Sequence, residues 1–251
     1  MSRQILMINP NVTEAITDVM AVEARRVAGP ETTIHAVTAE FGTLYIENRV
    51  EAAIAGHAVV DSLAKNGAGM DAAIVSAFGD PGLGAAKELM DIPVIGISEA
   101  AFLTARLLGR RYAIVCLTER LGVWYRECAE HHGLADQLAS VRPLKVGPQD
   151  ITRAKEEVAE KLLAEVELAV AEDGAEVVIM GGGPIAGLAK DLADRIPVPV
   201  LDGVTCAIRL AEAMVDLAPR PPIKGSFARP PAKPSKGLSE ALAAMIEHRD
   251  P

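Results

Sequence analysis

Two segments share one pattern, in which a short apolar run ends in a turn rich in glycine and proline and a helix-like stretch follows. The first copy is Val75-Ser76-Ala77-Phe78-Gly79-Asp80-Pro81-Gly82-Leu83, and the second is Gly181-Gly182-Gly183-Pro184-Ile185-Ala186-Gly187. In a parallel sheet such corners leave free backbone N–H groups at the C-terminal edge of the strands, where ligands of open α/β sheets bind. Two matched corners therefore predict one site built between two similar halves.

Strand-like apolar runs alternate with helix-like stretches along the chain. The predicted strands cover residues 4–8, 32–39, 71–77, 93–98, 111–117, 141–146, 177–180 and 197–201, and the predicted helices cover 14–27, 48–66, 81–90, 99–108, 118–132, 149–173, 185–195 and 206–217. This alternation predicts parallel strands with right-handed crossovers, and hence an α/β fold. A proline-rich, basic extension follows, and Ser235 is the predicted cap of a last helix at 236–248.

The net charge and the cysteine content exclude several classes of binding partner and indicate a cellular compartment. The formal net charge of −9 argues against nucleic acid or an anionic membrane surface as a partner, and no apolar run approaches the length of a membrane span. The three cysteines, Cys116, Cys128 and Cys206, show no metal-ligand spacing, so no metal site is predicted. An odd cysteine count without a pairing pattern, and a start without a signal-peptide-like region, predict a cytoplasmic protein.

Three motifs in order resemble the hydantoin and allantoin racemases of the aspartate/glutamate racemase superfamily. They are Ile8-Asn9-Pro10-Asn11, Phe78-Gly79-Asp80-Pro81-Gly82-Leu83 and Val200-Leu201-Asp202-Gly203-Val204. The resemblance implies two pseudo-symmetric lobes, each a parallel sheet flanked by helices, with the site in the cleft between them and no cofactor. It places lobe 1 at 1–98 plus 202–251, including the C-terminal extension, and lobe 2 at 99–201. A homo-oligomer is expected.

The resemblance also implies a pair of cysteines that face each other across the substrate, one removing a proton from the stereocentre and the other returning it. Here the two family positions hold Ala77 and Gly182. Neither side chain ionises, so two-base racemisation through these positions is excluded. The amide corners remain, and the N–H groups after Ala77 and Gly182 are expected to hold a carboxylate or imide oxygen.

Other side chains are candidates for the missing bases. Glu47 and Tyr45 lie on a predicted loop that is either a lid or an ordinary solvated loop, and Cys116 ends the predicted strand that opens lobe 2. A buried structural thiol is the alternative for Cys116. Ser76 is expected to point away from the site if its strand continues that far. The predicted substrate-binding residues are Asn11, Ala77, Phe78, Gly79, Thr118, Gly182, Gly183 and Pro184.

Two functions are compatible with these residues. The first is an enzyme, an isomerase, lyase or hydrolase, that acts on a small carboxylate or cyclic ureide through an enolate-type intermediate without the cysteine pair. The alternative is a non-catalytic relative that binds a small anion. We favour the enzyme, because opposed amide donors stabilise developing negative charge even without a strong base.

Overall fold

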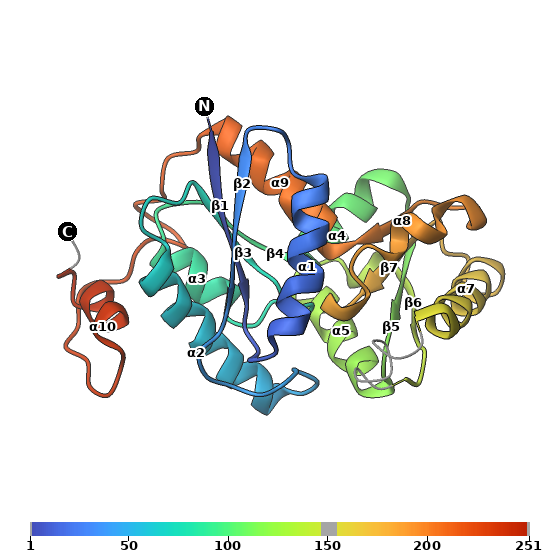
Figure 1. The fold of residues 1–251 in the computed structure, drawn as a ribbon, viewed down its shortest axis with the longest axis horizontal. Helices are drawn as coiled ribbons and strands as arrows, with labels where there is room; N and C mark the ends of the chain where they lie inside the picture. Colours follow the sequence, from blue (N-terminus) through green and yellow to red (C-terminus); the bar gives the residue numbers. More distant parts are fainter. Residues whose placement is uncertain (1, 147–154, 250–251) are drawn as a thin grey trace.

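The structure is a computed structural model that describes residues 2–146 and 155–249. It contains two four-stranded parallel sheets, one in each half of the molecule (Figure 1). In the first, the order β2-β1-β3-β4 joins β1 (Arg3–Asn9), β2 (Thr32–Thr38), β3 (Ala72–Val75) and β4 (Val94–Gly96). In the second, the order β6-β5-β7-β8 joins β5 (Tyr112–Cys116), β6 (Leu138–Pro143), β7 (Val177–Gly181) and β8 (Val200–Asp202). The shared order confirms the predicted α/β fold with two similar halves.

Helices connect and cover these strands. They are α1 (Glu14–Val27), α2 (Arg49–Asn66), α3 (Leu83–Leu89), α4 (Ile97–Leu108), α5 (Glu119–His131), α7 (Lys155–Ala171), α8 (Leu188–Leu192), α9 (Gly203–Leu217) and α10 (Glu240–Ile246). After β8 the chain returns to the first half, where α9 packs against α1, β3 and β4. Helix α10 packs against α2 at the outer edge (Figure 1). Among the described residues, no helix is long and apolar enough to cross a membrane.

Several element boundaries differ from the predicted ones. Asp202 accepts from Thr205 N–H at 2.9 Å and caps α9, which therefore begins at Gly203 rather than at the predicted 206. Helix α4 begins at Ile97 rather than at the predicted 99, so Ser98 lies inside its first turn. Ser239, not Ser235, caps the last helix. The strand predicted at 141–146 runs instead from 138 to 143, and the predicted helical start at 149–154 lies outside the described residues.

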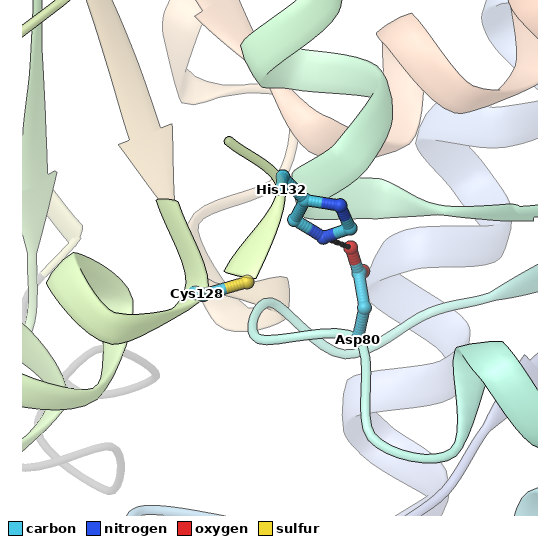
Figure 2. A group of neighbouring side chains, drawn as sticks. All are labelled: Asp80, Cys128 and His132. Atoms are coloured by element: carbon cyan, nitrogen blue, oxygen red, sulfur yellow. Dashed lines mark hydrogen bonds and ion pairs between the residues drawn. The ribbon is translucent and has the colours of Figure 1, made fainter. Parts of the chain in front are cut away.

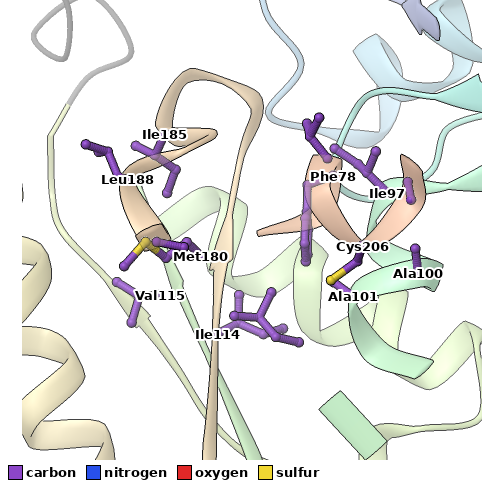
Figure 3. Packing of buried hydrophobic residues seen from close by; sticks show 14 of the residues in the cluster. Phe78, Ile97, Ala100, Ala101, Ile114, Val115, Met180, Ile185, Leu188 and Cys206 are labelled. Carbon is purple, nitrogen blue, oxygen red and sulfur yellow. The ribbon is translucent and has the colours of Figure 1, made fainter. Parts of the chain in front are cut away.

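One apolar core is continuous across both halves. It includes Ile5 and Met7 of the first sheet and Ile114 and Val115 of the second. Figure 3 shows part of this core, with Phe78 and Ile114 among side chains from the two halves. Each large side chain fully buried here stabilises the fold by about 1.5–3 kcal/mol. The halves are therefore joined by packing as well as by the chain.

Candidate functional site

The two glycine-rich corners meet at one small cavity between the sheets. Ala77 and Phe78, which follow β3, line it together with Gly182, Gly183 and Pro184, which follow β7. Among the described residues, no group accepts a hydrogen bond from the amide N–H of Phe78 or Gly183. Both donors are thus available to a ligand, and we call this pair of amide groups the cradle.

Glu47 reaches this cavity on the segment between β2 and α2. Its carboxylate accepts a hydrogen bond from the Thr118 hydroxyl at 3.1 Å, which connects the first half to the second. Thr118 also caps α5 by accepting from Leu121 N–H at 3.3 Å. The capped helix therefore fixes the hydroxyl, and the hydroxyl orients the carboxylate. Tyr45 lines the cavity beside Glu47.

Asn11 lines the opposite wall. Its Oδ1 accepts from Asn9 Nδ2 at 3.0 Å and from Thr13 N–H at 2.9 Å. Because the oxygen is already engaged, the Nδ2 group of Asn11 is the one that can donate to a ligand. Thr13 does not cap α1 with its side chain, since its hydroxyl donates to the Leu44 carbonyl at 2.5 Å and holds the Glu47 segment in place.

Two polar side chains of the cavity were not among the predicted site residues. Ser76 was expected to point away, but β3 ends at Val75, so the alternation of strand side chains does not extend to it. Ser76 lines the cavity, and its buried Oγ has no hydrogen-bond partner among the described residues. Such unsatisfied hydroxyls are uncommon in native interiors, and a bound ligand or water satisfies them.

Tyr125 of α5 is the second such residue. Its hydroxyl oxygen lies 3.8 Å from where a Cβ atom would stand at Gly182. Burial raises the pKa of this phenol well above its ordinary value, so the hydroxyl stays protonated at neutral pH. Tyr125 is a buried aromatic at helical spacing, a pattern that usually marks core, and nothing in the sequence singled it out.

The structure gathers eight of the predicted site residues and leaves three outside. Asn11, Tyr45, Glu47, Ala77, Phe78, Gly182, Gly183 and Pro184 line the cavity. Gly79 is engaged elsewhere, because its N–H donates to Ser98 Oγ at 3.1 Å. Thr118 does not line the cavity, but its hydroxyl donates to the Glu47 carboxylate. The Cys116 thiol is fully buried outside the lining, and burial raises its pKa to about 12, so it is a poor base.

Comparisons with known proteins place this chain in a family. The family model described as Asp/Glu/Hydantoin racemase matches residues 5–211. The chain belongs to the Asp/Glu/hydantoin racemase family. A hydantoin racemase from Paenarthrobacter aurescens is 33% identical over 232 residues, which cover 92% of this chain and 98% of that protein. The resemblance drawn from the three motifs is thereby confirmed.

Two solved structures are also similar to this chain. The allantoin racemase from Pseudomonas fluorescens is 35% identical, with a TM-score of 0.90 over 93% of this chain and 100% of that one. The allantoin racemase from Klebsiella pneumoniae is 33% identical, with a TM-score of 0.91 over 96% and 99%. These likenesses support a racemase-like function.

Proposed function

We propose that the chain is a cofactor-independent enzyme that acts on a small carboxylate or cyclic ureide through an enolate-type intermediate, without the cysteine pair. One observation carries the proposal: two amide donors without partners, at Phe78 and Gly183, share a cavity with the oriented carboxylate of Glu47. Each charge-assisted hydrogen bond from such a donor contributes about 1.5–3 kcal/mol. The cradle thus supplies the stabilisation that an enolate oxygen needs.

Glu47 is the proposed base. Its carboxylate takes the proton from the acidic carbon, and the electron pair left behind moves onto the adjacent carbonyl oxygen, which the Phe78 and Gly183 amides hold. The Tyr125 hydroxyl, beside Gly182, is the proposed donor that returns a proton to the carbon, and the proton held by Glu47 then passes through solvent to the tyrosinate, which restores both groups. An isomerase would use both groups, whereas a lyase or hydrolase would use the cradle and one of them.

The size of the cavity limits the substrate. Its volume is about 50 Å³, far below the roughly 300–1,000 Å³ of pockets that hold drug-sized ligands. A ligand as large as a hydantoin ring therefore binds only when the segment carrying Tyr45 and Glu47 moves outward. The Thr118 bond and the Thr13 bond to Leu44 are the contacts that such movement breaks.

Deuterium exchange at the acidic carbon tests the proposal on a panel of hydantoins, allantoin, substituted malonates and amino acids. We expect exchange with at least one of them, and a decrease of about 10²–10⁴-fold in Glu47→Gln. Glu40→Gln is the matched control, since Glu40 is exposed near the same segment and pairs with Lys65 at 2.7 Å. Exchange that survives Glu47→Gln would exclude Glu47 as the base. Thermal stabilisation by a ligand with no exchange at all would favour the non-catalytic alternative.

Two further proposals concern organisation. We propose that lobe 1 comprises 1–98 and 202–251 and lobe 2 comprises 99–201, which the packing of α9 on the first sheet supports. We also propose that the chain is a homo-oligomer, because Leu103 and Leu107 of α4 expose 48% and 83% of their surface. Light scattering of the purified protein tests the second proposal, and a monomeric mass would refute it.

A further inference from the structure

A second group of side chains lies between the halves, on the far side of the turn that follows Phe78. Asp80 comes from this turn, whereas Cys128 and His132 come from α5 and its C-terminal cap (Figure 2). The ligand atoms of these three residues all lie within 4.8 Å of one another. We propose that Asp80, Cys128 and His132 form a binding site for a divalent metal ion of the zinc type, independent of the proposed reaction.

The spacing of the α5 residues suits chelation. Cys128 and His132 are four residues apart, and His132 N–H still donates to the Cys128 carbonyl at 3.0 Å, so the helical repeat continues through both. Residues at positions i and i+4 lie on the same face of a helix, as do the two histidines of the H-E-x-x-H zinc motif. The thiol and the imidazole thus approach one point from a rigid element.

The Asp80 carboxylate is the third potential metal ligand, beside the thiol and the imidazole. Asp80 Oδ2 lies 3.1 Å from His132 Nε2, close to the roughly 3.3 Å that separates two donors on a tetrahedral zinc with bonds of about 2.0 Å. The carboxylate is itself fixed by two backbone donors, Ser98 N–H at 3.0 Å and Glu99 N–H at 2.7 Å. Metal ligands held by such outer hydrogen bonds are preorganised for binding.

The cluster opens onto solvent-accessible space. Asp80, Cys128 and His132 line a cavity of about 690 Å³ whose other walls include Trp124 and Lys87. Three protein ligands with one side open is the arrangement of zinc sites that keep a coordination position for water or an oxygen ligand. The site would therefore bind a metal that still accepts one small oxygen-donor ligand.

Cobalt(II) and zinc(II) titrations of the chelator-treated full chain test the site. We expect one ion per chain, a near-ultraviolet thiolate-to-cobalt charge-transfer band, and displacement of cobalt by zinc. Cys128→Ser should abolish the band and weaken zinc binding at least tenfold, and His132→Gln should also weaken it at least tenfold.

Matched controls separate this site from ordinary metal contacts. Cys206→Ser removes another buried thiol, and His57→Gln removes an exposed imidazole outside this cavity; both should retain the band and bind zinc within twofold of the parent chain. Circular dichroism confirms that each variant is folded. Absence of the charge-transfer band, or zinc affinity that Cys128→Ser and His132→Gln leave unchanged in folded protein, would overturn the assignment. Deuterium exchange in chelator is a separate measurement, so failure of this site leaves the proposed function intact.

Discussion

Asp80 is the residue whose replacement gives the sharpest test of how the turn after β3 is held. Its carboxylate, 7% exposed, accepts from Ser98 and Glu99 N–H groups at 3.0 and 2.7 Å. A hydrogen bond to a charged group contributes about 1.5–3 kcal/mol, so loss of both in Asp80→Ala should lower the free energy of unfolding by about 3–6 kcal/mol. This is a large part of the roughly 5–15 kcal/mol typical of a folded protein.

Three substitutions at this position separate the contributions. Asp80 has φ of 47°, in the left-handed region, so alanine adds backbone strain of about 1 kcal/mol or more that glycine avoids. Asp80→Gly should therefore be the more stable of the two truncations. Asp80→Asn keeps an oxygen acceptor and tolerates this backbone conformation, so we expect it to lose about half as much as Asp80→Ala.

Urea unfolding in chelator, followed by circular dichroism, measures these differences from the midpoint and slope. Asp71→Ala is the control, because its carboxylate accepts one backbone bond, from Gln4 N–H at 2.7 Å, at an exposed position. A loss below about 1 kcal/mol in Asp80→Ala would refute the view that this carboxylate anchors the turn to α4.

Three further outcomes follow from the same structure. Gly79→Ala should unfold the chain or strongly lower the urea concentration at its unfolding midpoint, because a Cβ atom there would lie 2.4 Å from the Trp124 ring at a φ of 106°. Gly84→Ala in α3 meets nothing within 4 Å, so it should stabilise the fold by about 0.5–1 kcal/mol. Urea unfolding midpoints of the two variants compare these effects. Cys116, with its pKa raised to about 12, should resist thiol reagents at pH 8 until denaturant is added, and rapid native labelling at Cys116, located by mass spectrometry, would contradict its burial. Burial alone would raise the pKa of Glu212, but hydrogen bonds from Thr32 and Gly29 outweigh it and lower the pKa. The ionised carboxylate therefore stabilises the fold fully above the ordinary glutamate pKa, and this contribution is lost as the pH falls through the pKa of the folded state. Glu212→Gln should remove this part of the acid dependence of the free energy of unfolding.

The sequence was sufficient for the sheets because buried parallel strands are continuous apolar runs between glycine-rich turns, and both corners of the cradle followed from that. Glu47 and Tyr45 were expected beside the site because they lie on a loop next to a strand end, and both line the cavity. The expectation for Ser76 held only if β3 continued past Val75, and the strand ends there. Tyr125 looks like any core aromatic until its hydroxyl is placed beside Gly182.

The cluster at Asp80 shows a different limit. Asp80 and His132 are 52 residues apart in the chain, so no local spacing links them. Only the packing of α5 against the turn after β3 brings the carboxylate to the thiol and the imidazole. Contacts between residues in separate halves of a fold cannot be predicted from short sequence motifs.

The backbone of Gly182 restricts which residues can stand at this corner. Its φ of 135° is a shape that residues with a side chain rarely adopt, although the space around it would accommodate a Cβ atom. A Gly182→Cys substitution would therefore strain the turn after β7, so a thiol cannot be placed at this corner without a cost in backbone conformation.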